Sequence, residues 1–363
     1  MTCLDLRKRL GVLSIFGVIM FAGLVGLAGS FDFGVSSAYA QSAGNVPGGT
    51  LGNVGDPEIW RFARRGGCGT VSIPDKSAGC LVQSDGDVWR AVKNGALSQA
   101  GGWSLLGIIV FIGLFYAYRG KIMVDSGLSG QTIERFNSLE RFAHWMTASS
   151  FIVLALSGLN IFYGRYVIKP LIGAEAFAWL TSILKFAHNY VGFAFIAGII
   201  LMFVLWVRDN IPLLEDLKWL AVGGGLFSKG FHPPARRFNA GQKIIFWAVM
   251  IGGGSLAVSG LALVFQGQIL LWGSTFAVLN IFGFDLPTTL TVLQEGQLNI
   301  IWHTIVAIFM MVVIVGHIYI GSVGMQGAIE AVSTGQVDLN WAKEHHSQWV
   351  EEHKGEIRGQ PAE

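Results

Sequence analysis

The stretch NIIWHTIVAIFMMVVIVGHIYI, residues 299–320, is apolar over most of its length and yet contains two histidines, His303 and His317. An α-helix turns about 100° per residue, so fourteen residues bring the two imidazoles to within about 40° of each other on one face. The rise over this distance is about 21 Å, most of the thickness of a membrane's hydrocarbon core. An ionisable side chain at this depth is costly to bury without a partner, which makes both histidines functional candidates.

The composition of the whole chain agrees with a membrane protein. Of the 363 residues, 52% are hydrophobic and 13% are charged, whereas soluble domains carry about 25% charged residues. The formal net charge of +2 gives no indication of nucleic-acid binding. We find no internal repeat with a period of about 20–50 residues.

Five apolar segments approach the roughly 17–25 residues that a membrane-spanning helix needs. They are residues 102–118, 145–163, 188–207, 244–265 and 299–323. Residues 268–297, which include Pro287, are expected to form an interfacial helix and loop outside the membrane. The predicted fold is an all-α membrane protein, in which the last four segments form a transmembrane bundle and the first is an extra N-terminal helix.

The N-terminus has the pattern of a secretory signal peptide. Basic residues 7–9 and an apolar run precede Ala38-Tyr39-Ala40, which indicates cleavage after Ala40. An uncleaved first membrane helix is the alternative. The predicted parts are a signal peptide at 1–40, an exported (periplasmic) extension at 41–100, an extra transmembrane helix at 101–120, the bundle at 133–330 and a cytoplasmic tail at 331–363.

The charges of the loops predict how the chain crosses the membrane. Basic residues concentrate in the loops after the first and third apolar segments, while the loop after the fourth has no Lys or Arg. By the positive-inside rule, the mature N-terminus is expected in the periplasm and the C-terminus in the cytoplasm. The predicted location is therefore the bacterial inner (cytoplasmic) membrane, crossed several times.

The three cysteines exclude some redox chemistry. Cys3 would leave with the signal peptide, and Cys68 and Cys80 could form a disulfide in the exported segment or remain two free thiols. An iron–sulfur cluster is normally held by four thiolates, so this chain cannot hold a cysteine-ligated cluster alone. The absence of C-x-x-C-H argues against covalent haem attachment.

Two further histidines complete a pattern in depth. His144 lies where the first bundle helix leaves the inner surface, and His188 opens the second bundle helix at the outer surface. Depth alone therefore pairs His188 with His303 and His144 with His317. Each pair could grip the iron of one haem from both sides, because neutral imidazole is a good haem ligand. Di-metal and proton-relay sites would need carboxylates at this depth, and the apolar segments contain essentially none.

Other residues carry weaker signals. The remaining histidines lie in loops or the tail and are interpreted as solvated; they are His232, His345, His346 and His353. Five glycines within the apolar helices could admit either a flat ligand or a neighbouring helix; they are Gly158, Gly192, Gly254, Gly260 and Gly316. Three arginines are candidates for pairing with haem propionates, namely Arg141, Arg165 and Arg237.

Several stretches together resemble one family. They are RFAHW, FAHNYVG, RRFNAGQKIIFW, HTIVAIFMMVVIVGHIY and GAIEAVSTGQVDLNWAKEHHSQW. In this order and spacing they resemble the gamma subunit of membrane-bound respiratory formate dehydrogenase, which is a di-haem cytochrome b. The resemblance extends from about residue 133 to the C-terminus, and the earlier part of the chain resembles the longer members with an exported extension and an extra helix.

The resemblance implies a four-helix bundle with two haem b groups whose iron is held by His144, His188, His303 and His317. It also implies a quinone site (ubiquinone or menaquinone) in the loop Asn239, Ala240, Gly241, Gln242 and Lys243. The implied partners are a catalytic subunit with a molybdenum or tungsten pterin and an iron–sulfur subunit. Formate would be oxidised on the catalytic subunit, and no catalytic residue is expected in this chain.

Electrons from the iron–sulfur subunit would then pass through the two haems to a membrane quinone, as part of a respiratory chain. One alternative is the same cytochrome serving a nickel–iron hydrogenase or a thiosulfate reductase. Another is a haem-free membrane anchor or transporter.

Overall fold

The computed structural model describes residues 86–225 and 230–356. The predicted signal peptide, and most of the predicted exported extension with Cys68 and Cys80, lie outside the described residues. The described chain divides into two units, which we treat separately. The larger holds residues 102–225, 230–264 and 302–356, and the smaller holds residues 86–101 and 265–301.

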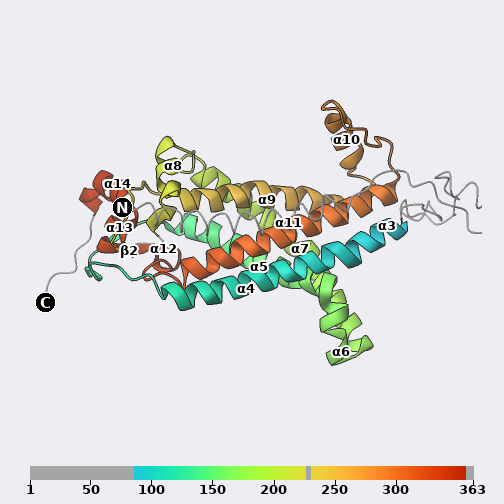
Figure 1. Ribbon diagram of the computed structural model, residues 1–363, viewed down its shortest axis with the longest axis horizontal. Coiled ribbons are helices and arrows are strands. Elements are labelled where there is room, and N and C mark those ends of the chain that lie inside the picture. Colours follow the sequence, from blue (N-terminus) through green and yellow to red (C-terminus); the bar gives the residue numbers. More distant parts are fainter. Residues whose placement is uncertain (1–85, 226–229, 357–363) are drawn as a thin grey trace, which may run out of the picture. The chain divides into compact units, whose positions relative to one another are not determined.

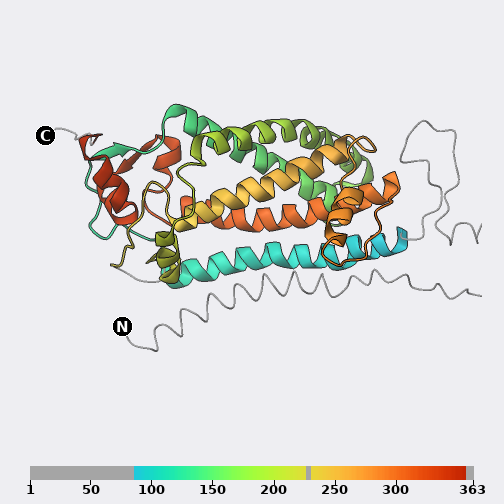
Figure 2. The same ribbon diagram turned by 90° about the horizontal axis from the view of Figure 1, so that it is seen from above.

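Within the described residues, five helices are long and apolar enough to cross a membrane. They are α4 (Ser98–Arg119), α5 (Ser138–Val167), α7 (Ala174–Trp206), α9 (Ala240–Val264) and α11 (Val292–Gly321). In the larger unit these helices run side by side (Figures 1 and 2). Each contains one of the apolar segments of the sequence to within two residues at its end, so the predicted all-α membrane fold is confirmed.

The helices begin earlier than their apolar segments. From the sequence, His188 was expected to open the second bundle helix. In the structure this helix, α7, starts at Ala174, so His188 lies within it. Residues 174–187 are rich in alanine and leucine, which favour helix without requiring a membrane. Similarly, α4 is preceded by the π-helical segment η2 (Val92–Leu97) and by α3 (Gly86–Ala91), so the end of the predicted exported extension is helical.

The helices α5 and α9 start with the same capping box. In α5 the Asn137 side chain accepts a hydrogen bond from the backbone of Glu140 at 3.0 Å, and the Glu140 carboxylate accepts one from the Asn137 backbone at 2.9 Å. In α9 Asn239 and Gln242 make the equivalent pair of bonds at 3.0 and 3.1 Å. These bonds satisfy two of the backbone N–H groups that a helix start leaves without partners.

The two capped helices are related by an internal repeat. The sequence RFN at 135–137 recurs at 237–239, and LALSGL at 154–159 recurs as LAVSGL at 256–261, with a constant offset of 102 residues. This offset is longer than the periods that identify repeat proteins, and for that reason the sequence analysis missed it. The repeat makes α5 and α9 equivalent elements of the bundle.

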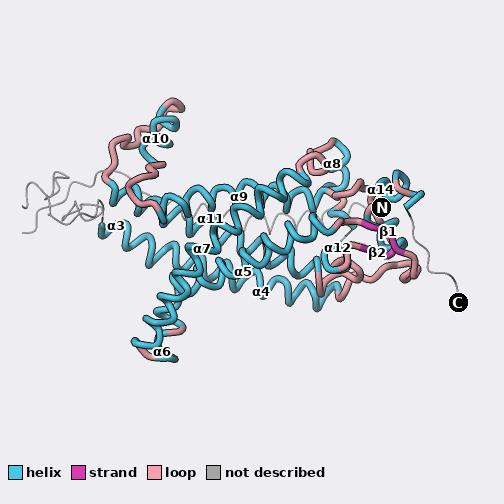
Figure 3. Tube along the Cα trace, turned by 180° about the vertical axis from the view of Figure 1, so that it is seen from behind, coloured by secondary structure: helices cyan, strands magenta, loops and turns pink. Residues whose placement is uncertain are grey.

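The larger unit has a folded cap at one end, which we call the polar end (Figures 1 and 3). Here β1 (Thr132–Glu134) pairs antiparallel with β2 (Gln336–Asp338), and Ile133 faces Val337 with both side chains fully buried. Short helical segments complete this part of the larger unit; they are α8 (Leu214–Ala221), η3 (Gly223–Gly225), α12 (Glu330–Ser333), α13 (Leu339–His345), α14 (Ser347–Glu352) and η4 (Lys354–Glu356). The predicted tail is therefore a folded segment as far as residue 356.

A hydrophobic cluster holds the polar end together. It joins the RFN phenylalanines Phe136 and Phe238 to Trp206 of α7 and to Trp341 and Trp349 of the C-terminal helices, all at least nine-tenths buried. A second cluster fills the bundle and includes Phe195, Ile199, Val249 and Met310.

The outer surface of the bundle, by contrast, is apolar. Large side chains such as Leu156, Val204 and Ile251 are more than 60% exposed. Soluble proteins rarely expose apolar patches of this extent, so the surface suits lipid.

Two short elements remain. In the larger unit, α6 (Lys169–Ile172) immediately precedes α7. In the smaller unit, α10 (Trp272–Asn280) lies in the segment that was expected to form an interfacial helix. The buried Glu295 carboxylate accepts hydrogen bonds from the backbone of Leu271, Trp272 and Gly273 at 2.8–3.0 Å. This carboxylate satisfies the N-terminal N–H groups of α10 and fixes the helix to the start of α11.

Candidate functional site

The four predicted histidines form two facing pairs in the larger unit. The rings of His188 and His303 have centroids 6.3 Å apart with an interplanar angle of 67°. The rings of His144 and His317 have centroids 6.4 Å apart with an angle of 61°. We call the first the far pair and the second the polar-end pair. These are the pairs that depth predicts from the sequence.

Both separations fit a shared metal ion. Metal–imidazole bonds are about 2.0 Å long, so two imidazoles on opposite sides of one ion have ring centres roughly 6.3 Å apart. Imidazoles in direct van der Waals contact would be able to approach more closely, and neither pair makes a hydrogen bond between its two rings. The donor set of two neutral imidazoles is also one that haem iron takes.

The far pair is held by two serines. The Ser157 hydroxyl lies 2.8 Å from Nδ1 of His188, and the Ser259 hydroxyl lies 2.9 Å from Nδ1 of His303. These serines occupy the same position of the LA-x-SGL repeat in α5 and α9. Neither serine was predicted from the sequence, and the repeated LA-x-SGL motif is the signal that could have identified both.

The polar-end pair has a different environment. Nδ1 of His144 is buried and has no hydrogen-bond partner among the described residues. The ring of His144 makes an edge contact with Trp145, with centroids 5.4 Å apart. The two pairs therefore differ in hydrogen bonding at Nδ1. Both histidines of the far pair have a serine partner there, whereas His144 of the polar-end pair has none among the described residues.

The five glycines separate into two groups. A Cβ atom at Gly158 would lie 3.4 Å from Cε1 of His188, and one at Gly260 would lie 3.5 Å from Cε1 of His303. A Cβ atom at each of the other three would meet nothing within 4 Å; these are Gly192, Gly254 and Gly316. Two glycines thus leave room for the far-pair rings, and three border space that a flat group could fill. The residues present fit the haem that the sequence predicts.

The predicted quinone loop is the capped start of α9. The side-chain oxygens of Asn239 and Gln242 accept backbone hydrogen bonds in the capping box, and Oε1 of Gln242 also accepts from Arg135. The amide nitrogens of both side chains make no bond to other described residues. Two amide NH₂ groups, with two N–H donors each, are therefore free for a carbonyl oxygen.

The other residues of this loop are more engaged. Nζ of Lys243 is 2.8 Å from Asp216 and 3.1 Å from the carbonyl oxygen of Ile211, and its side chain is buried. Ala240 is also buried. A Cβ atom at Gly241 would lie 3.1 Å from the Trp219 ring, so the close approach that this glycine permits in the structure is that of α8.

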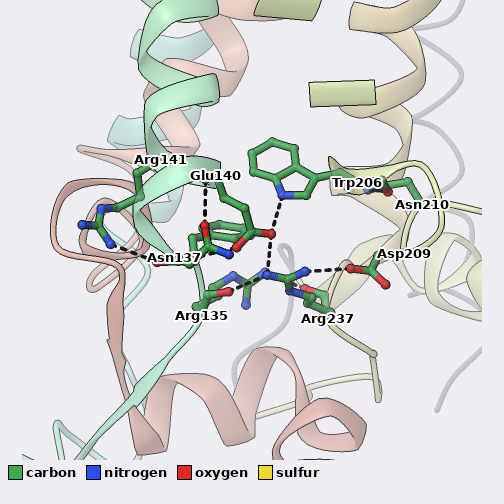
Figure 4. Close-up of polar contacts among 9 residues, drawn as sticks. Arg135, Asn137, Glu140, Arg141, Trp206, Asp209, Asn210 and Arg237 are labelled. Atoms are coloured by element: carbon green, nitrogen blue, oxygen red, sulfur yellow. Dashed lines mark hydrogen bonds and ion pairs between the residues drawn. The ribbon is translucent and has the colours of Figure 1, made fainter. Parts of the chain in front are cut away.

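Beside the loop, two arginines join the capped helices (Figure 4). Arg135 donates to the carbonyl oxygen of Arg237 at 2.7 Å, and Arg237 donates to that of Arg135 at 2.9 Å. Each also reaches the capping box of the other helix, Arg135 through Gln242 and Arg237 through Glu140 at 2.7 Å. We call this reciprocal arrangement the arginine clasp.

Further contacts anchor the clasp. Glu140 also accepts from Nε1 of Trp206, and Arg237 is paired with Asp209, both at 2.8 Å. Arg237 is thus bonded to two carboxylates, which argues against the role at haem propionates that its sequence position suggested. The guanidinium of Arg135 lies within 6 Å of four aromatic rings, those of Phe136, Phe238, Trp341 and Trp349. Burial and the neighbouring Arg237 lower the pKa of Arg135 to about 9, so it remains charged at neutral pH.

A cleft of about 590 Å³ opens at the same end. Its walls include Glu140, Arg208, Arg237, Lys243 and His353. A wall with charges of both signs suits water and mobile protons better than an apolar ring.

Not all of the histidines that were expected to be solvated are exposed in the structure. His346 is completely buried and donates from Nδ1 to the carbonyl oxygen of Arg236 at 2.7 Å. The prediction was wrong because a C-terminal histidine was assumed to lie on an extended tail, whereas α13 and α14 are packed. His232 lies 2.9 Å from Asp125 and 3.7 Å from Glu344. Glu344 of α13 also accepts from the backbone of Asp125 and Ser126, so hydrogen bonds between two loops and α13 account for this cluster.

Comparisons with known proteins agree with this geometry. The prokaryotic cytochrome b561 family matches residues 135–333, more than half of the chain. The formate dehydrogenase cytochrome b556(fdo) subunit of Escherichia coli K12 is 30% identical over 227 residues, which are 61% of this chain and 93% of the relative. The nitrate-inducible cytochrome b556(Fdn) subunit of the same strain is 27% identical over 228 residues, 61% and 91% of the two chains. A formate dehydrogenase cytochrome b556 subunit of Haemophilus influenzae is 26% identical over 228 residues, 61% and 83%.

Proposed function

Because the chain belongs to the prokaryotic cytochrome b561 family, we propose that it is the membrane cytochrome b subunit of a formate dehydrogenase and passes electrons through two haem b groups to a membrane quinone. The relatives of known function are cytochrome subunits of this enzyme. The single observation that supports the proposal most strongly is the presence of two histidine pairs, each at the ring separation that a shared iron requires.

The roles of the chain's residues follow from the fold. His188 and His303 hold one iron, and His144 and His317 hold the other. Each haem supplies reversible one-electron chemistry, and the protein contributes ligation, spacing and polarity. Since His303 and His317 share one helix, α11 fixes the distance between the two sites.

The quinone contact is assigned to residues 239–243 at the polar end. The free amide groups of Asn239 and Gln242 donate to a quinone oxygen. Lys243, through its bond to Asp216, keeps α8 against the start of α9. Reduction of a quinone to a quinol takes two electrons and two protons, and the charged cleft of the polar end gives protons an aqueous route towards this loop.

The direction of transfer completes the proposal. The far pair faces the periplasm, where an iron–sulfur partner subunit delivers electrons that a molybdenum- or tungsten-pterin subunit takes from formate. The polar end faces the cytoplasm, as the loop charges predict. Protons taken up on the cytoplasmic side then make turnover contribute to the membrane potential.

Isosteric changes test the quinone assignment without breaking the capping box. Asn239→Asp and Gln242→Glu keep the oxygens that cap α9 and remove the amide donors. In the purified complex, both variants should slow quinone reduction at least tenfold while formate still reduces the haems at the rate of the unaltered complex. Asn137→Asp is the matched control, because it makes the same change in the capping box of α5, and it should leave both rates unchanged.

The proposed quinone contact is wrong if Asn239→Asp and Gln242→Glu reduce quinone as fast as Asn137→Asp. The subunits that purify with the chain answer a separate question. A nickel–iron hydrogenase subunit in place of a pterin subunit would assign the same cytochrome to another enzyme.

A further inference from the structure

The two serines at the far pair have only one arrangement that uses all of their hydrogen bonds. Oγ of Ser157 lies 2.6 Å from the carbonyl oxygen of Val153, and Oγ of Ser259 lies 2.7 Å from that of Ser255. At such distances a proton must lie between the two oxygens, and only the hydroxyl can supply it. Each hydroxyl therefore donates to the helix and accepts from the Nδ1–H of the histidine.

This arrangement fixes the tautomer of both histidines. With the proton on Nδ1, the lone pair of each ring is on Nε2, the nitrogen then available to a metal. Both serines are at most 1% exposed, so water does not compete for Nδ1. The glycine that follows each serine leaves room for the ring beside it, so Ser-Gly acts as a unit in α5 and again in α9.

We propose that Ser157 and Ser259 are positioning residues that orient His188 and His303 and strengthen them as ligands, so that the far pair is the low-potential site of the chain. The inference rests on the proposed function, because it takes the far pair to be iron ligands. A histidine that donates its second N–H to an acceptor becomes a more basic ligand. A more basic ligand favours ferric over ferrous iron and lowers the reduction potential.

The polar-end pair lacks this support. His144 has no acceptor for Nδ1 among the described residues, and its ring faces Trp145. Its iron is therefore expected to have the higher potential. The difference gives electron transfer a direction, because transfer from the far pair to the polar-end pair is then downhill, towards the end of the unit that carries the loop at residues 239–243.

The test measures potentials, which a purely structural role would not move. Ser157→Ala and Ser259→Ala are prepared in the full complex, with Ser157→Thr and Ser259→Thr to restore the hydroxyl. Ser149→Ala is the matched control, because Ser149 donates to the helix carbonyl of Trp145 at 2.7 Å and makes no hydrogen bond to a described histidine. For each, the haems are counted and both midpoint potentials are titrated optically.

Each Ala variant should raise the potential of one haem by up to about 59 mV, the value of a tenfold change in ferric-over-ferrous preference for one electron. The haem that shifts should be the one that His188→Ala eliminates. The other haem should keep its potential, and the Thr variants and Ser149→Ala should match the unaltered complex.

Three results would overturn the inference. In the first, the Ala variants keep both haems at unchanged potentials. In the second, the haem that shifts is the one lost in His144→Ala. In the third, the Thr variants, with their hydroxyls intact, shift as far as Ala or lose haem. A complex of the unaltered chain that contains no haem would instead refute the proposed function, so the two failures are distinguishable.

Discussion

Arg135 and Arg237 occupy equivalent places in a repeated RFN sequence, and they use them in equivalent ways. Each donates to the backbone of the other and to the capping box that starts the other's helix. Ionic bonds are strongest where water is excluded, and here the carboxylate of Glu140 is only 5% exposed. The arginine clasp therefore holds α5 and α9 together at the polar end.

Replacing Arg237 with glutamine should weaken the fold measurably. Glu140 would keep its bonds to Trp206 and Asn137 but would lose its only salt bridge among the described residues. Removing one partner of a buried ion pair costs about 3–5 kcal/mol, and the partial exposure of Arg237 favours the lower end. Denaturant unfolding in detergent should show a loss of about 3 kcal/mol.

The control for this change is Arg208→Gln. Arg208 lines the same cleft but is exposed and makes no ion pair with the described residues. Its stability should stay within about 0.5 kcal/mol of the unaltered protein. Equal losses in the two variants would mean that the clasp contributes no stability.

At this scale the sequence predicts the two histidine pairs better than the side chains that support them. The four histidines are recognisable because imidazoles are rare at membrane depth, and their depths alone assign the pairs. Ser157 and Ser259 are not recognisable in this way, since a hydroxyl in a membrane helix usually bonds to its own backbone. Only the packing of α7 on α5 and of α11 on α9 shows that these hydroxyls also meet a histidine.

Among the elements, the folded C-terminal segment should respond to pH. Burial and the nearby Arg135 keep the pKa of His346 well below its ordinary value, and burial beside His232 lowers the pKa of His345 to about 4. Unfolding returns both pKa values to about 6.5, so the unfolded segment binds protons that the folded one does not. The free energy of unfolding of this segment is therefore highest above about pH 6.5. It decreases on acidification, by up to about 1.4 kcal/mol per pH unit for each histidine.

Hydrogen exchange can measure this dependence locally. After correction for intrinsic rates, the amides of α13 and α14 should lose protection between pH 7.5 and 5.5, while amides in the middle of α9 should not. In His346→Gln the glutamine amide can still donate to Arg236 but cannot be protonated, so the loss should be about halved. Equal protection of α13 and α14 at both pH values in the unaltered protein would contradict the account.

The element boundaries show where hydropathy stops being informative. Apolar segments mark the residues within the hydrocarbon, but a helix begins where a capping box starts it and ends where a turn or a glycine stops it. α7 therefore extends fourteen residues before His188, and α5 begins at Ser138, directly after the Asn137 cap and seven residues before the apolar segment expected from residue 145. The C-terminal helices were missed because their buried faces form only when Trp341 and Trp349 pack against α7 and the RFN segments.

For the molecule as a whole, the motifs of the sequence led to the right family, and the formate dehydrogenase resemblance is confirmed by the relatives. The chain is a multi-pass bacterial membrane protein of this family. Its orientation in the membrane stays a prediction from loop charge. The number of haems, the quinone and the partner subunits stay predictions from the histidine pattern and the family resemblance. These predictions depend on one another, because α11 carries one histidine of each pair.

The most direct test of this account counts haem in the four histidine variants of the purified complex. The unaltered chain should contain two haem b groups. His188→Ala and His303→Ala should each lose the same haem, identified by its midpoint potential, and His144→Ala and His317→Ala should each lose the other. If the losses pair the histidines differently, or if all four variants keep two haems, the proposed ligation and the electron path built on it are wrong.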